Sequence, residues 1–174
     1  MKNRGFSLVE LMITTALFSA MTVIVMQILI TSQRGWSAGS DIQELQNNLN
    51  LGMSNMLREL QNTNLDKITA DADSVVFQVP VGYNTGGEII WGADNTSGNK
   101  ISYSVDVQRR LVRGLLNAAD SVVSSRILAN DIQTLAFDFT ANIKIITISL
   151  TAIKQSFNHP DVFQNISSKV SFRN

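Results

Sequence analysis

Few residues in this chain have side chains suited to chemistry, and they are scattered. The single histidine, His159, stands in a polar stretch before Pro160, where a lone histidine is far more often solvated than a ligand or a base. Asp71 and Asp73, and the segment 94–99, offer oxygen atoms that could bind calcium. Neither has the spacing or the closing glutamate of an EF-hand loop. We therefore expect solvated turns rather than metal sites at both places.

Composition and motifs exclude several classes of function. The chain has no cysteine, so disulfides, thiolate metal sites and cysteine nucleophiles are absent. It contains none of the GxSxG, HExxH, Walker A or dinucleotide glycine patterns. Its 14 basic and 14 acidic residues are mixed, and the densest basic cluster, Arg109, Arg110 and Arg113, is expected to face water or to pair with acids. We predict no enzyme activity, no cofactor and no nucleic-acid partner.

One acidic residue, Glu10, occupies an unusual place. It directly precedes an apolar run, residues 11–30, which as a helix rises about 30 Å and so matches the hydrocarbon thickness of a bilayer. The polar members of that run are Thr14, Thr15, Ser19, Thr22 and Gln27. Lys2 and Arg4 come before the run and Arg34 follows it, which predicts a cytoplasmic leader and an exported C-terminal part. A carboxylate at the edge of such a segment is costly and commonly marks function.

A cleaved secretory signal is the first alternative for this segment. Small residues at positions 38–40 resemble a signal peptidase site. The apolar run is longer than the roughly 7–15 residues of a signal-peptide core. A retained anchor therefore explains the pattern better.

The residues around Glu10 resemble a known processing signature. Residues 5–11 read Gly-Phe-Ser-Leu-Val-Glu-Leu directly after the short basic leader, and this is similar almost residue for residue to the prepilin signature of the type IV pilin-like family. The resemblance implies that a prepilin peptidase cuts between Gly5 and Phe6 and methylates the new amine of Phe6. Glycine suits such a cut because it lets an extended backbone enter a narrow active site. The acid at the family's fifth mature position corresponds to Glu10, which the resemblance implies acts in filament assembly.

Beyond residue 30 the pattern predicts an amphipathic second half of the same helix. Apolar residues recur there at three- and four-residue steps: Ile42, Leu45, Leu49, Met53, Met56 and Leu60. This stripe spans fewer than three heptads, so we expect a face of the domain core rather than a coiled coil. Gly35, Gly39 and Gly52 weaken the helix, and the sequence leaves open a bend or a locally melted stretch at residues 35–40.

From residue 74 onward the apolar period becomes two, which predicts strands. Their expected ranges are 74–80, 88–93, 100–106, 110–113, 132–140, 144–154 and 169–173, with connectors at 83–87, 94–99 and 141–143. In each of the two longer strands, alternate apolar residues are expected to share one face. These residues are Leu135, Phe137 and Phe139 in the first strand, and Ile146, Ile148, Leu150 and Ala152 in the second. The last strand, after a polar loop, is expected to bury Val170 and Phe172. The predicted fold class is α+β: a long N-terminal helix, with a membrane-spanning half and an amphipathic half, packed on antiparallel β-sheet.

The pilin-like family also places a helix before a sheet. Segments 44–48, 56–60, 101–103, 111–113, 127–130 and 172–174 are similar to those of PilW-type minor pilins and of J-type minor pseudopilins of type II secretion. The C-terminal cysteine pair and the helix proline of typical major pilins are missing. The resemblance therefore implies a minor subunit rather than the principal subunit of a filament.

Three parts follow from these observations: residues 1–5 as leader peptide, 6–34 as transmembrane and assembly helix, and 35–174 as exported domain. The resemblance implies a single-pass inner-membrane protein with a periplasmic domain, assembled into or at the tip of a type IV pilus or a secretion pseudopilus. Its implied partners are other pilins or pseudopilins, the prepilin peptidase, the inner-membrane assembly platform and membrane lipid. The alternative is a membrane-anchored exported binding module. Glu10 and the leader favour the filament subunit, because a plain tether needs neither.

Overall fold

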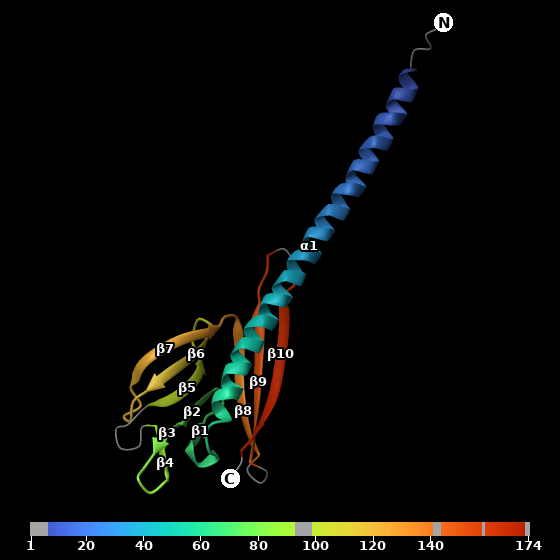
Figure 1. Ribbon diagram of the computed structural model, residues 1–174. Helices are drawn as coiled ribbons and strands as arrows, with labels where there is room; N and C mark the ends of the chain where they lie inside the picture. The colour runs from blue at the N-terminus through green and yellow to red at the C-terminus, as the bar shows by residue number, and fades with distance from the viewer. Residues whose placement is uncertain (1–6, 93–98, 141–143, 158, 173–174) are drawn as a thin grey trace.

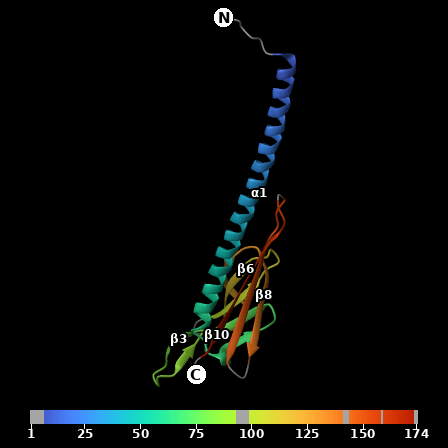
Figure 2. The same ribbon diagram turned by 90° about the vertical axis from the view of Figure 1, so that its right-hand side faces the viewer.

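A single long helix and a β-sheet domain make up the molecule (Figure 1). The computed structural model describes residues 7–92, 99–140, 144–157 and 159–172. Helix α1 (Leu8–Leu60) is followed by a short 3₁₀ turn, η1 (Leu65–Lys67), and the regular elements described after that turn are strands. The N-terminal half of α1 stands clear of the domain, and its C-terminal half packs on the sheets, as Figures 1 and 2 both show. This arrangement confirms the predicted α+β class.

Helix α1 is continuous through residues 35–40, so a melted stretch there is wrong. A Cβ atom built at Gly35 or at Gly39 would have no other atom within 4 Å, so neither glycine serves a close packing contact. Each glycine costs the helix about 1 kcal/mol relative to alanine. That cost does not interrupt a helix that is already nucleated on both sides.

The strands form two main antiparallel sheets and a separate hairpin. The first sheet has the order β1-β2-β5-β6-β7, the second β10-β9-β8, and the hairpin pairs β3 with β4. The first sheet comprises β1 (Ile68–Ala70), β2 (Ser74–Gln78), β5 (Lys100–Val105), β6 (Leu111–Leu116) and β7 (Val122–Ala129). The others are β8 (Ile132–Thr140), β9 (Ile145–Lys154), β10 (Val162–Ser171), β3 (Pro80–Tyr83) and β4 (Ile89–Trp91).

The core lies between the C-terminal half of α1 and the two main sheets. The predicted helix stripe is buried from Leu45 to Leu60, whereas Ile42 at its start is only half-buried. On β9 the predicted face is fully buried, and the predicted burial of Val170 and Phe172 is confirmed. At Gly52 the helix has no side chain, and leucine side chains of β6 and β9 pack against it there. Burying this apolar surface stabilises the domain by about 25 cal/mol per Å².

The predicted faces of β8 and β9 are confirmed, but the apolar side chains of β8 become more exposed from Leu135 to Phe139. Leu135, Phe137 and Phe139 of β8 pair with Leu150, Ile148 and Ile146 of β9, so they share the core side of the sheet. Leu135 is buried, whereas Phe139 is 38% exposed. Strand β8 is the edge strand of its sheet and pairs with β9.

Two strand predictions need correction. The polar loop expected before residue 169 is strand, because β10 pairs with β9 over ten residues from Val162 to Ser171. Strand β7 was not predicted, since Val122, Val123 and Ile127 are exposed and follow no alternation. The short strands β1 and β3 were also not predicted. Of the expected connectors, 141–143 and all but the last residue of 94–99 lie outside the described residues.

Candidate functional site

The start of α1 holds Glu10 in a capping box with Ser7. Ser7 is extended (φ −76°, ψ 147°), and its Oγ accepts a hydrogen bond from the Glu10 N–H at 3.4 Å. The Glu10 Oε2 accepts one in return from the Ser7 N–H at 3.1 Å. Two of the backbone donors that every helix N-terminus leaves open are thereby satisfied. We missed this cap from the sequence, although the Ser-x-x-Glu spacing is its signature.

Gly5 and Phe6 lie outside the described residues, so the proposed cut stays a prediction. Covalent structure still relates it to Glu10. Cleavage would create an amine on Phe6, which is three bonds away from the Ser7 nitrogen that the Glu10 carboxylate contacts. A carboxylate at a helix N-terminus is also favoured by the helix dipole. Glu10 therefore presents an exposed negative charge close to the place where a positive charge would form.

Residues 8–36 of α1 are exposed around the whole circumference of the helix. By length and composition, α1 can cross a membrane, and it is the one helix among the described residues that can. Its hydroxyl groups bond within the helix: Ser19 Oγ donates to the Thr15 carbonyl at 2.8 Å, and Thr22 Oγ1 donates to that of Phe18 at 2.8 Å. Such internal bonds suit a segment that lies in lipid or among other apolar helices.

His159 is not the solvated residue that we expected. Its side chain is only 4% exposed, and its Nε2 lies 3.0 Å from Oδ2 of Asp41 on α1. Nearby, Lys154 forms an ion pair with Glu44 of the same helix, and the hydrogen bond that Lys154 donates to Glu44 raises the pKa of Lys154. These contacts hold the connection between β9 and β10 on the helix. A role as base or ligand gains no support from them.

Two of the three arginines in the cluster pair with acids, which is one of the two arrangements that we predicted. Arg110 Nη2 lies 2.6 Å from Asp106 Oδ2, and this hydrogen bonding holds the pKa of Asp106 below its usual range. Arg113 Nε lies 3.0 Å from both carboxylate oxygens of Glu59. Arg109 is exposed in the turn between β5 and β6, with φ 58°. The cluster is therefore structural rather than a free basic surface.

Glu59 also accepts a hydrogen bond from the buried Tyr103 hydroxyl at 2.6 Å. Burial, and then the Glu59 carboxylate, raise the pKa of Tyr103 far above its usual value of 10.0. Burial alone would lower the pKa of Arg113, but its bonds with Glu59 outweigh that effect and raise it. The three side chains join the last turn of α1 to β5 and β6. No sequence pattern predicted this junction.

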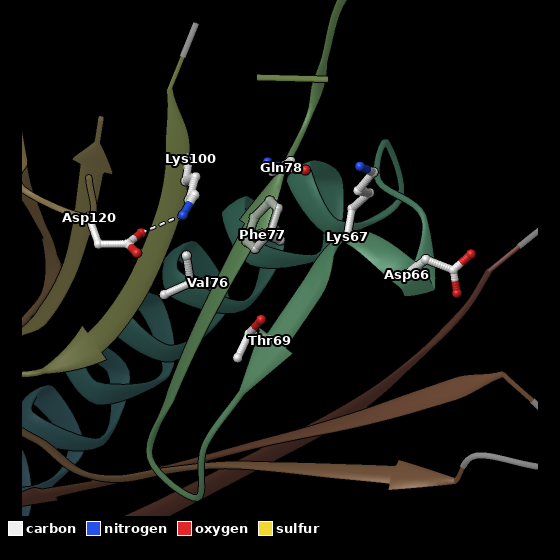
Figure 3. Close-up of a pocket in the computed structure, with 8 residues that line it drawn as sticks. All are labelled: Asp66, Lys67, Thr69, Val76, Phe77, Gln78, Lys100 and Asp120. Atoms are coloured by element: carbon white, nitrogen blue, oxygen red, sulfur yellow. Dashed lines mark hydrogen bonds and ion pairs between the residues drawn. The ribbon is translucent and has the colours of Figure 1, made fainter. Parts of the chain in front are cut away.

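The first sheet has a shallow hollow, and this is the place where a binding module would hold a ligand (Figure 3). Its lining residues are Asp66, Lys67, Thr69, Val76, Phe77, Gln78, Lys100 and Asp120. Lys100 Nζ lies 2.6 Å from Asp120 Oδ1, and Figure 3 shows Asp66 directed away from this pair. The charges therefore do not converge on one ligand. Over the described residues, no three His, Asp or Glu side chains come together to hold a metal ion.

These features together define the architecture of the protein. A capped acid begins a bare apolar helix that rises from a helix-on-sheet domain, which is a pilin-like architecture. Residues 1–26 match the family described as the prokaryotic N-terminal methylation motif. The chain therefore has a type IV pilin-like N-terminus with an N-methylation motif, joined to a domain of pilin-like architecture. Comparison with curated proteins and with solved structures found no match.

Proposed function

We propose that this chain is a minor pilin or minor pseudopilin, built into or at the tip of a type IV pilus or a type II secretion pseudopilus. The observation that carries the proposal is the methylation motif over residues 1–26 on a helix whose apolar half is wholly exposed. The motif implies processing by a prepilin peptidase. Before assembly, residues 6–34 anchor the chain once in the inner membrane and residues 35–174 lie outside it.

The exposed half of α1 supports a filament subunit over a tether. A tether needs only one apolar membrane span. This helix also has an acid in its first turn, which a tether does not require. An apolar helix that is exposed all round can leave lipid for a bundle of similar helices at little solvation cost, since lipid and the bundle are equally apolar. Helix transfer from membrane to filament is the physical step that this surface permits.

In this proposal Glu10 sets the register of each new subunit. The amine of Phe6 keeps its basicity on methylation, and a free α-amine has a pKa near 7.7 to 8, so it is largely cationic at neutral pH. Pairing it with Glu10 of an adjacent subunit adds little net stability, because desolvation offsets the attraction. A misplaced subunit, however, leaves a charge unpaired among apolar helices. The pair therefore selects the correct position rather than strengthening the filament.

The minor-subunit part of the proposal rests on the likeness to PilW-type minor pilins and J-type pseudopilins and on the missing cysteine pair. A subunit built into or at the tip of a filament contacts other pilins or pseudopilins and the inner-membrane assembly platform. The neighbouring genes distinguish the two filament types, through either pilus retraction machinery or a secretion operon.

Intact-mass measurement tests processing. In cells that contain a prepilin peptidase, the recovered chain should begin at methylated Phe6, and in cells that lack the peptidase it should keep residues 1–5. Protein that retains its leader in the first cells, or that is cut near Ser40, would contradict the assignment.

A further inference from the structure

Two aromatic side chains near the membrane end of the domain are exposed to solvent. Trp36 on α1 is 84% exposed, and Phe157, between β9 and β10, is fully exposed. Single exposed apolar residues are ordinary on protein surfaces. What sets these two apart is their depth relative to the membrane-spanning part of α1.

Trp36 lies just beyond the apolar run. Because α1 is continuous, the distance of each later helix residue from Ile30, at the end of that run, follows from the rise per residue. Trp36 follows six residues later, about 9 Å along the axis at 1.5 Å per residue. The headgroup layer extends roughly 5 to 8 Å beyond the hydrocarbon on each side. Helix side chains lean toward the N-terminus, so the indole ring reaches back into that layer.

Strand β9 carries the second aromatic residue toward the same level. Leu150 packs at Gly52, whereas Lys154 pairs with Glu44, so the strand runs along α1 toward the membrane end. Three further residues, beyond the end of β9, lead to Phe157 and span at most about 10 Å at 3.3 Å per residue. Figures 1 and 2 both show the connection between β9 and β10 beside the helix.

Burial on the helix marks how far this connection reaches. Residues 31–36 are all exposed, whereas Ser37 and Ala38 are half-buried. The contact between His159 and Asp41 holds the connection in place. Phe157 therefore lies one helical turn or less from the level of Trp36 along the axis.

The two aromatic residues lie on different sides of the helix. Asp41 faces the connection, and Trp36 is five residues away, which at about 100° per residue places it roughly 140° around the axis. Arg34 is exposed and lies on α1 between the apolar run and Trp36. Its long side chain can reach lipid phosphates.

We propose that Trp36 and Phe157 lie in the lipid headgroup layer while the chain is anchored in the membrane, and that together they fix the domain's orientation on the bilayer. The proposal rests on the membrane anchoring in the proposed function. The indole of Trp36 favours this layer because it combines an apolar body with a polar N–H group, and the apolar ring of Phe157 is removed from water there. Contacts on opposite sides of the axis oppose tilting of the domain in both directions.

Fluorescence of single tryptophans in vesicles tests this. The chain has two tryptophans, so Trp91→Phe leaves Trp36 as the sole reporter. The full-length protein is placed in phosphatidylethanolamine and phosphatidylglycerol vesicles, with or without a headgroup-labelled nitroxide lipid. We expect severalfold stronger quenching of Trp36 by that lipid than by aqueous iodide. Phe157→Trp in a Trp36→Phe, Trp91→Phe background should behave in the same way.

The matched control is Tyr83→Trp in the same background. Tyr83 is 73% exposed in the β3–β4 hairpin, at the end of the domain far from the free part of α1 (Figures 1 and 2). Its reporter should be quenched by iodide and not by the labelled lipid. Reporters at 36 and 157 that iodide quenches as freely as the control, or a control that the lipid quenches equally, would overturn the proposal. Protein that fails to float with carbonate-washed vesicles would instead overturn the anchoring on which both proposals rest.

Discussion

At the scale of single residues, Glu10 serves two purposes that can be separated. As the third helical residue it accepts the Ser7 N–H and so caps α1. As a carboxylate it carries a charge for a partner. A cap of this kind contributes about 1 kcal/mol to a helix, and a glutamine fills the same position in the capping box. Charge and cap are therefore removable one at a time.

We predict that Glu10→Gln and Glu10→Ala both leave membrane insertion and cleavage after Gly5 intact and both reduce incorporation into filaments. The reason is that each variant loses the charge that pairs with the Phe6 amine. Ser7→Ala should keep incorporation, because it weakens only the cap. Shear fractionation and crosslinking to partner subunits measure incorporation. Normal incorporation of Glu10→Gln would refute the charge mechanism, and loss of cleavage would assign Glu10 to peptidase recognition.

The N-terminal methylation motif was predictable because it depends on neighbouring positions in the sequence, and the roles of its single residues stay predictions. Gly5, Phe6 and Glu10 stand at fixed spacings before an apolar run. His159 was not predictable in the same way, because its partner Asp41 is 118 residues distant in the chain. A buried pair of this kind depends on the completed fold.

At the scale of elements, the junction of Glu59, Tyr103 and Arg113 joins α1 to the first sheet. Because the pKa of Tyr103 is raised in the folded protein, the neutral phenol is the favoured form there. A group with a raised folded pKa contributes its full stability below its unfolded pKa, here 10.0, and loses it as the pH rises further. The junction should therefore weaken in strong alkali and not in acid through this residue.

We predict that the free energy of unfolding declines above about pH 10, and that Tyr103→Phe makes this decline shallower. Tyr103→Phe should cost about 1 kcal/mol at neutral pH, the value of one hydrogen bond, since Glu59 keeps Arg113. Denaturant titrations of the full chain in detergent measure both. The control is Tyr83→Phe, which leaves Tyr103 as the only tyrosine. If the folded control shows phenolate absorbance near pH 10, Tyr103 ionises at its usual pH and the prediction is wrong.

Strands with one buried face were predictable, and strands without one were not. On β9 every second residue is buried and the alternation is plain. On β7 the first six residues are exposed, and on β10 polar residues dominate, so neither shows an apolar period. Backbone pairing with a neighbour makes these segments strands. The division into two sheets was equally out of reach, because strand order depends on contacts between distant segments.

At the scale of the whole molecule, α1 belongs to two environments. Its buried residues begin at Leu45, its half-buried residues begin at Ser37, and Asp41 pairs with His159 of the β9–β10 connection. Residues 7–36 are all exposed. We keep the boundary between residues 34 and 35 as a proposal, which this change in burial supports. The general plan was predictable because membrane-spanning and amphipathic patterns differ so clearly in sequence.

The sheet domain should fold without the exposed half of α1. A fragment that starts at Ser40 removes the exposed apolar half of α1 but keeps the whole buried stripe and the contacts of Asp41 and Glu44 with the sheet. It should be soluble and folded, with more strand than helix by circular dichroism. A fragment that starts at Met53 loses Leu45 and Leu49, and truncating one buried leucine costs about 2 to 5 kcal/mol, so the shorter fragment should not fold.

Within the longer fragment, Leu49→Ala tests whether the helix stripe holds the domain together. Leu49 is 2% exposed, so the substitution should lower the free energy of unfolding by about 2 to 5 kcal/mol. The matched control is Gln46→Ala, because Gln46 lies on the exposed side of the same turn and should change stability by less than about 0.5 kcal/mol. Equal effects of the two substitutions, or aggregation of the Ser40 fragment itself, would show that the sheets do not depend on this part of α1 and that the domain begins elsewhere.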